Sequence, residues 1–185
     1  MGIVVVGATM SLDGFIAGPG DAMDWIFEYA LGPEHGNPLD LSIIKSTGAV
    51  LTGRRCYDVG RRAERPETSG LYGGLWQGPE FVLTHAPPDD EDRPSITFLS
   101  GDIRGAVATA LSAAGGLDLL VLGADVIGQC LDAGLVDEIR LHVAPVLLGD
   151  GVRLFRRPAG PNIQLETLLV LPAGPVTDMY FRVTK

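Results

Sequence analysis

The sequence predicts an α/β fold with a mostly parallel central sheet, helices on both of its faces and an antiparallel hairpin at the C-terminus. The first observation is that strand and helix patterns alternate over roughly the first 135 residues, which is typical of parallel strands joined by crossover helices. The second is that three strand patterns then follow without a helix, which predicts antiparallel strands added at an edge of the sheet. The third is that 46% of the 185 residues are hydrophobic while no repeat or linker divides the chain, which predicts a single domain over residues 1–185.

The strands are predicted from short apolar runs. A continuous run of aliphatic residues, such as IVVVGA at 3–8 or LDLLVLG at 117–123, is typical of a strand buried on both faces. EIRLHVAPVLL at 138–148 instead alternates apolar and polar residues, which predicts a half-buried strand. Two strand patterns on either side of PAGP predict the closing hairpin. In chain order the predicted strands span residues 3–8, 49–53, 80–84, 95–99, 117–123, 138–148, 163–171 and 176–183.

The helices are predicted from apolar residues that recur on one face. Residues 102–114 place such residues at a spacing of four, and Gly134 is a suitable C-cap for the helix before it. In chain order the predicted helices span residues 24–31, 39–46, 54–60, 102–114 and 125–133. Clusters of Gly, Pro and charge predict loops at 11–21, 63–79 and 85–94. The last of these is predicted to be an exposed turn, because its four consecutive acids are not expected to pack.

Charge and composition argue against several classes of protein. The formal net charge is −9 and the isoelectric point is about 4.7, which argues against a nucleic-acid-binding surface. The apolar runs are too short to span a membrane, and no basic residues precede the N-terminal apolar stretch, so we expect neither a membrane segment nor a signal peptide. Cys56 and Cys130 are too few for a disulfide scaffold, and we predict a cytoplasmic protein. The sequence lacks the common zinc, nucleophile-elbow and P-loop motifs, so we expect no metal site.

The strand-to-helix junction LVLGADVIGQ at 120–129 is the first candidate binding site. Gly123 and Ala124 follow a predicted buried strand, and their small size lets a ligand approach the backbone. The helix behind them offers free N–H groups and the positive end of its dipole, which suits a phosphate or pyrophosphate. The alternative is that these small residues only pack the helix onto the strand, with Asp125 as an acid of the first turn.

An arginine cluster at 54–65 is the second candidate, and it holds five of the twelve arginines of an acidic chain. Arg54 and Arg55 open a helix directly after a strand, where positive charge is unfavourable to the helix dipole, and such a broken local rule often marks function. A guanidinium beside free helix amides suits a phosphate monoester. The alternative, a solvated basic helix face, suits the other three: Arg61, Arg62 and Arg65.

The glycine-rich loop MSLDGFIAGPGD at 10–21 is the third candidate. It carries one acid, Asp13, and two apolar residues, Phe15 and Ile16, which is what a lid over a flat heterocycle needs. In an open α/β sheet the ligand crevice lies beyond the carboxyl ends of the strands, so we expect all three candidates to meet there. The alternative is a plain surface loop.

The segments SLDGFIAG, LTGRRCYD, FVLTHAP and LVLGADVIGQCLDAGLVDEIRLHVAPVLLGDGVRLF occur in an order that resembles the dihydrofolate-reductase-like family. More narrowly, the chain resembles the reductase domain at the C-terminus of the bacterial riboflavin-biosynthesis protein and its stand-alone relatives, over nearly its whole length. The resemblance implies a three-layer αβα fold, NADPH as cofactor and hydride transfer to a small heterocycle, such as a pterin or a ribosylaminopyrimidine. It also implies a homodimer, to whose interface the strand at 138–148 is expected to contribute.

The resemblance also implies how the cofactor lies across the carboxyl ends of the strands. The 2′-phosphate side would be taken by Gly53, Arg54 and Arg55 of the strand-then-GR motif. The adenosine would lie along Leu83 and Thr84. The pyrophosphate, and the approach to the nicotinamide, would be held by Gly123, Ala124, Asp125, Val126 and Ile127. The nicotinamide pocket would be lined from the opposite side by Thr9, Ile16 and Ala17, and the proton would come from Asp13 or from water.

Two departures from the family pattern leave the substrate open. Dihydrofolate reductases carry a carboxylate on the helix before the GR strand, and none of Asp24, Glu28 and Asp40 is in register with it. Riboflavin-pathway reductases usually place an acid where Leu122 stands. A non-catalytic NADP-binding module therefore stands beside the reductase as an alternative. A phosphate-sugar binding protein is a third possibility, which needs the arginines but not the nicotinamide pocket.

Overall fold

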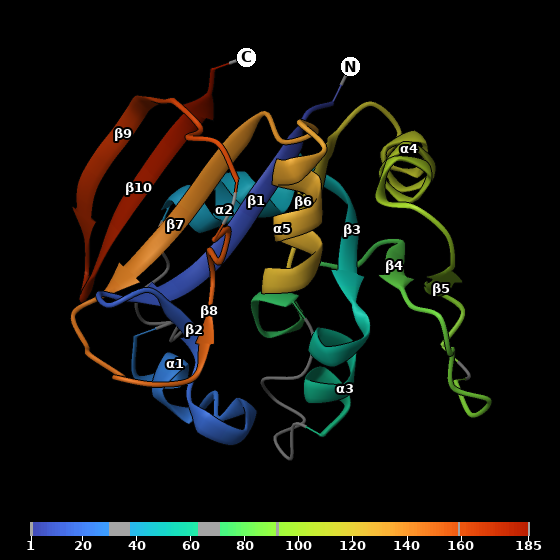
Figure 1. Cartoon of the computed structure of the whole chain (residues 1–185), viewed down its shortest axis with the longest axis horizontal. Helices are drawn as coiled ribbons and strands as arrows, with labels where there is room; N and C mark the ends of the chain where they lie inside the picture. The colour runs from blue at the N-terminus through green and yellow to red at the C-terminus, as the bar shows by residue number, and fades with distance from the viewer. Residues whose placement is uncertain (1, 30–37, 63–70, 92, 159, 185) are drawn as a thin grey trace.

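The computed structural model describes residues 2–29, 38–62, 71–91, 93–158 and 160–184 (Figure 1). They form an eight-stranded sheet in the order β5-β4-β3-β6-β1-β7-β10-β9. The first six strands in that order run parallel, and the hairpin β10–β9 is antiparallel, which confirms the predicted fold class. The strands of this sheet are β1 (Val4–Ser11), β3 (Thr47–Gly53), β4 (Glu80–Leu83), β5 (Ile96–Leu99), β6 (Asp118–Val121), β7 (Glu138–Ala144), β9 (Leu165–Ala173) and β10 (Val176–Val183).

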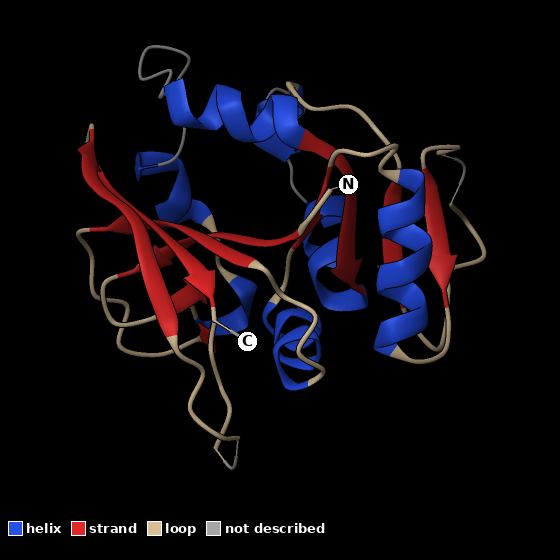
Figure 2. Ribbon diagram, turned by 90° about the horizontal axis from the view of Figure 1, so that it is seen from above, coloured by secondary structure: helices blue, strands red, loops and turns tan. Residues whose placement is uncertain are grey.

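The helices cover both faces of the sheet. They are α1 (Asp24–Tyr29), α2 (Pro38–Ser46), α3 (Arg54–Arg62), α4 (Ile103–Ala113) and α5 (Ala124–Asp132). Figure 1 shows α5 in front of the central strands and α2 behind them, and Figure 2 shows helices on both sides of the sheet. Among the described residues, no helix has both the length and the apolar character that crossing a membrane requires.

Alternate residues of β1 pack into two separate cores, as the two-residue period of a strand requires. Val4 and Val6 join the larger cluster, in which α4 and α5 bury their apolar sides. Val5 joins a smaller cluster with Trp76 and Ile44 of α2. We call these two sides of the sheet the α5 face and the α2 face.

Strand β7 differs from its prediction in direction and in place. It pairs parallel to β1, from Glu138 beside Val5 to Ala144 beside Ser11, because α5 acts as a crossover between β6 and β7. It lies between β1 and β10, so its backbone is paired on both sides and residues 138–144 cannot form an edge for a second copy. The strand ends before Pro145, which has no N–H to donate to the ladder.

The structure also contains short elements where loops were predicted. Strand β2 (Phe15–Ala17) pairs with β8 (Val152–Arg153). A sequence pattern cannot indicate this pairing, because each strand is too short to show a period and its partner is more than a hundred residues away. Single helical turns occur as η1 (Pro19–Asp21) and η4 (Leu71–Gly74). The predicted helix end at 30–31 and residues 63–70 of the predicted loop at 63–79, with Arg65, lie outside the described residues.

Candidate functional site

Four parallel strands end at one edge of the sheet and bring the predicted binding segments together. β3 leads into α3, β6 leads into α5, and β1 leads into the loop before β2 (Figure 1). β4 ends beside β3, with Leu83 in register with Gly53. This edge is where open α/β sheets bind ligands.

Two glycines bring the starts of α3 and α5 into contact. Gly123 is the N-cap of α5 with φ 84° and ψ 128°, a backbone conformation that L side chains rarely adopt. A β-carbon at Gly123 would lie 3.4 Å from Cβ of Cys56 on α3, and one at Gly53 would lie 3.1 Å from Cγ2 of Val126 on α5. The absence of both β-carbons lets the first turns of the two helices pack closely against each other and against the end of β3.

The first turn of α5 can offer main-chain donors at this point, but little side-chain contact. The amide of Ile127 donates to the carbonyl of Gly123 over 3.0 Å, and the side chains of Val126 and Ile127 are buried in the core. The carboxylate of Asp125 accepts a hydrogen bond from its own helix neighbour Gln129 at 2.9 Å. Of the predicted pyrophosphate residues, the amides of 124–126 therefore fit best, and Ile127 has a packing role.

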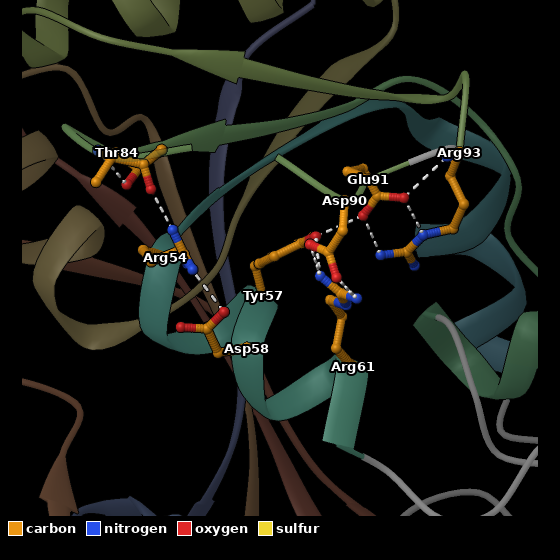
Figure 3. A network of polar contacts seen from close by, with 9 residues as sticks. Arg54, Tyr57, Asp58, Arg61, Thr84, Asp90, Glu91 and Arg93 are labelled. Carbon is orange, nitrogen blue, oxygen red and sulfur yellow. Dashed lines mark hydrogen bonds and ion pairs between the residues drawn. The ribbon is translucent and has the colours of Figure 1, made fainter. Parts of the chain in front are cut away.

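Arg54, the first residue of α3, links this helix to the turn after β4. Its Nε donates to Oδ1 of Asp58 at 2.9 Å, and its Nη1 donates to the carbonyl of Ala86 (Figure 3). The amide of Ala86 in turn donates to Oγ1 of Thr84 at 3.2 Å. The predicted 2′-phosphate residue Arg54 and the predicted adenosine residues Leu83 and Thr84 thus lie side by side.

The side chain of Arg55 is more exposed than that of Arg54, and it pairs with Asp21, which belongs to a distant segment of the chain. Its side chain is 66% exposed, and its Nε donates to Oδ1 of Asp21 at 2.6 Å. Both arginines of the predicted phosphate site therefore already have a carboxylate partner. Because an exposed ion pair contributes little to stability, a phosphate can replace such a partner at low cost.

The other end of α3 is fixed to the loop 85–94 by a polar network that we call the α3 latch, made of Tyr57, Arg61, Asp90, Glu91 and Arg93 (Figure 3). Arg61 forms two hydrogen bonds of 3.0 Å with Asp90, and Arg93 forms bonds of 2.9 and 2.7 Å with Glu91. The Tyr57 hydroxyl donates to Glu91 at 2.5 Å. Arg61 is therefore paired rather than simply solvated.

Glu91 corrects the prediction that the acids of this loop do not pack, since its side chain is only 7% exposed. Hydrogen bonds from Arg93 and from Tyr57 hold the pKa of Glu91 well below its usual range. Burial, and the neighbouring Glu91 carboxylate, raise the pKa of Tyr57. A buried acid is tolerated here because donors from α3 and from its own loop surround it.

Asp13 holds two loops together at the end of β1. It accepts hydrogen bonds from Ser11 Oγ at 2.6 Å and from the amides of Leu148 and Gly149 at 3.1 and 2.8 Å. The bond from Ser11 contributes most to lowering the pKa of Asp13 to about 2, and the two amides add to it. Asp13 is thus ionised at neutral pH and fully engaged, so we do not assign the proton of the reaction to it.

The residues predicted for the nicotinamide pocket lie around β1 and β2, but not on one surface. Thr9 alternates with Ala8 and Met10, which pack in the α5-face core, so its side chain lies on the α2 face. Ile16 packs against the α5-face core, and Ala17 is buried in β2. The three residues share only their position near the carboxyl end of β1.

Sequence reasoning missed the pair formed by His142 on β7 and Asp178 on β10, whose Nδ1 and Oδ1 atoms are 2.6 Å apart. Asp178 is fully buried. The sequence gives a weak indication that His142 is a site residue, since it alternates with the apolar residues of its strand. Asp178 had none, because its partner lies 36 positions earlier in the chain. No cluster of three or more potential metal ligands occurs in the part of the chain that the structure describes.

The strand order, with its parallel strands and antiparallel C-terminal hairpin, gives this protein the fold of dihydrofolate reductase. Dihydrofolate reductase from Enterococcus faecalis, complexed with NADP(H), superposes with a TM-score of 0.62 at 13% identity over 99% of this chain and 97% of that chain. A candidate riboflavin biosynthesis protein from Shewanella sp. PV-4 superposes with a TM-score of 0.79 at 21% identity over 99% of both chains. At these identities the likeness shows the fold alone.

The chain belongs to the RibD C-terminal domain family, whose model matches residues 59–176. Among its relatives is the uncharacterized protein YyaP of Bacillus subtilis (strain 168), which is 28% identical over 158 residues, 82% of this chain and 79% of that protein. The predicted family is thereby confirmed.

Proposed function

We propose that the protein is an NADPH-dependent reductase that transfers hydride to a C=N or C=O carbon of a small heterocyclic or sugar-like substrate. The observation that carries the proposal is the close approach of the starts of α3 and α5 at Gly53 and Gly123, which brings the amides of α5 and the arginines of α3 to one edge of the sheet. Membership of the RibD C-terminal domain family and the likeness to reductase folds support it.

The residues at this edge fit a dinucleotide phosphate. The amides of 124–126, at the N-terminus of α5, would face the pyrophosphate. Arg54 and Arg55 would meet the 2′-phosphate, exchanging Asp58 and Asp21 for it. The bound nicotinamide supplies the hydride, and this chain's own part is to orient cofactor and substrate.

The proposed preference for NADPH over NADH follows from these two arginines. A hydrogen bond to a charged group contributes roughly 1.5–3 kcal/mol, and solvent exposure at least halves that. With one or two such contacts surviving, we expect a preference of about 10- to 300-fold. The preference should shrink as salt concentration rises, because salt screens exposed charges.

The proposal is tested by binding first and by turnover second. NADPH and NADH are titrated separately, and quenching of the fluorescence of Trp25 and Trp76 measures binding. A panel of pterins, ribosylaminopyrimidines and quinones is then screened for turnover, which is measured as loss of reduced-nicotinamide absorbance. Saturable NADPH binding with reduction of a panel compound supports the reductase. Binding without turnover across the panel favours the non-catalytic module, and failure to bind either nucleotide overturns the proposal.

The homodimer stays a prediction, and we propose a different surface for it. β9 is the last strand of the sheet and exposes Leu165, Leu168 and Val170. An exposed apolar edge strand is a ready partner for the same strand of a second copy. Sedimentation of the wild type against Val170→Asp tests this, and a monomeric wild type would contradict it.

A further inference from the structure

The pair His142–Asp178 is a buried polar feature that the proposed cofactor edge does not use. The two side chains are 2.6 Å apart, and they are 15% and 0% exposed. Burying a carboxylate is unfavourable unless it is paired, and such a pair is weak evidence for a purely stabilising role. β7 and β10 are already joined by six registered residue pairs, so the sheet does not depend on this contact alone.

The pair lies next to the predicted nicotinamide residue Thr9. Thr9 is in register with His142 in the parallel pair β1–β7, and His142 is in register with Asp178 in the antiparallel pair β7–β10. Residues in register share a face, so all three side chains form one row across the α2 face. Thr9 and His142 each stand two residues before the end of their strand, which places the row at the proposed ligand edge.

We propose that His142, oriented by Asp178, lies at the hydride-transfer site and donates the proton to the substrate. The proposal rests on the reductase function proposed above. As the hydride forms the new C–H bond, the π electrons of the C=N or C=O group move to its nitrogen or oxygen. That atom takes the Nε2 proton of a protonated His142, and the imidazole regains a proton from solvent.

Asp178 is then a positioning residue, because it acts through His142 rather than on substrate. A carboxylate that accepts from Nδ1–H fixes the ring orientation and leaves Nε2 as the nitrogen that exchanges its proton. The short contact between them is typical of a charge-assisted hydrogen bond.

The charged groups nearest to Thr9, His142 and Asp178 form a separate cluster around Arg140, which lies two residues before His142 on β7. Arg140 bonds Glu138 at 2.8 Å, lies 3.7 Å from Asp118 and stacks over the ring of Tyr180 at 5.8 Å. With Thr9 and Asp178, these are the described polar groups of β1, β6, β7 and β10 that flank His142 on the α2 face. Since the charge of Arg140 is compensated by two acids, Asp178 is, among the residues that the structure describes, the carboxylate in direct contact with His142.

Histidine NMR tests the placement without knowledge of the substrate. The chain has only three histidines, and His142→Gln and His85→Gln assign the ring nitrogen signals of isotope-labelled protein. The probes are NADP⁺ and 2′-phospho-ADP-ribose, which lacks only the nicotinamide. We expect NADP⁺ to shift the His142 signals and 2′-phospho-ADP-ribose to leave them unchanged, while both shift His85 beside the adenosine strand.

The outcomes separate this inference from the function on which it rests. If both probes bind and His142 responds to them alike, the inference is overturned and the reductase proposal stands. If neither binds, the reductase proposal and this inference fail together. In wild-type protein the neutral ring should be protonated on Nδ1, and Asp178→Asn should give a mixture of tautomers, whereas an unchanged tautomer would contradict the positioning role.

Kinetics with the compound reduced in the panel then test the proton itself. His142→Gln should lower kcat at least tenfold and flatten its pH profile, with the dissociation constant of NADPH within twofold of wild type. Arg182→Gln, on the same strand as Asp178 but paired with Glu166 of β9, serves as the control with unchanged kcat. A His142→Gln variant with wild-type kcat and pH profile would overturn the assignment.

Discussion

The two ends of α3 hold their arginines in different ways. At the first turn, Arg55 meets Asp21 through an exposed contact, and Arg54 meets an acid of its own helix. At the last turn, Arg61 is held by two hydrogen bonds to Asp90 beside the buried carboxylate of Glu91. In the proposed function the first pairs exchange their carboxylates for a phosphate, whereas the latch joins the helix to the loop 85–94 through the buried side chain of Glu91. Position relative to the end of β3, rather than basic composition, thus distinguishes the arginines that we propose to bind phosphate from those of the α3 latch.

Removing Glu91 should have the largest effect on stability, because it breaks the latch at its buried member. Arg93 is half-exposed, so the larger cost comes from the hydrogen bond that the Tyr57 hydroxyl loses; at about 2 kcal/mol for a polar group left unpaired, we expect Glu91→Ala to lower Tm by roughly 4–8 °C. NADPH affinity should change by less than about tenfold, since the phosphate arginines are untouched. Calorimetry with and without NADPH measures both, and a wild-type Tm would show that the latch carries no stability.

The latch should also weaken in acid, since the folded pKa of Glu91 is lowered below its unfolded value. Its contribution is present above an unfolded pKa of about 4.3 and is lost as pH falls toward the folded value. The Tm difference between wild type and Glu91→Ala should therefore narrow below about pH 4. A difference that stays constant down to pH 2 would contradict an ionic origin.

Gly123→Val should disturb the contact between α5 and the first turn of α3, at the end of α3 opposite to the latch. Its β-carbon would contact Cys56, and a β-branched residue at φ 84° is strained, so the first turn of α5 must shift. We expect NADPH affinity to fall more than tenfold, about 1.4 kcal/mol, together with some loss of Tm. Gly128→Ala in the same helix is the control, because its β-carbon meets open space. Normal NADPH binding by Gly123→Val would remove the pyrophosphate assignment.

Asp13→Asn should loosen the loop at the end of β1 by a smaller amount. The folded pKa of about 2 lies below the ordinary value of 3.8, so ionised Asp13 stabilises the fold at neutral pH and this contribution fades as pH falls toward 2. We expect Tm to drop by several degrees at pH 7 and by little at pH 2. An equal drop at both values would mean that the shape of Asp13, and not its charge, holds the loop.

Arg61→Gln should show the smallest effect. Asp90 is 71% exposed, so the pair contributes little to stability, and we expect Tm to fall by at most a few degrees. Thermal unfolding at low and high salt measures it, and the difference from wild type should disappear at high salt. A loss as large as that of Glu91→Ala would show that the latch depends on its exposed member.

The sequence predicted what depends on local pattern and failed where partners are distant. The mostly parallel sheet followed from the alternation of strand and helix patterns, and the three candidate binding segments met at the expected edge because parallel strands share it. Glu91 and Asp178 look like ordinary surface acids in sequence, since their burial depends on Tyr57 and His142, more than thirty positions away. The sequence singled out Asp13 as a candidate residue, but the hydrogen bonds that give it a structural role come from the amides of Leu148 and Gly149, in a turn far along the chain.

The most direct measurement compares two arginine pairs of the same helix. NADPH and NADH are titrated against wild type, Arg54→Ala/Arg55→Ala and Arg61→Ala/Arg62→Ala. We expect the first double variant to lose NADPH affinity at least tenfold and NADH affinity by less than about threefold, and the second to bind both as wild type does within about threefold. Equal affinity of wild type for the two nucleotides, or equal losses of NADPH affinity in the two double variants, would contradict a 2′-phosphate site at the start of α3.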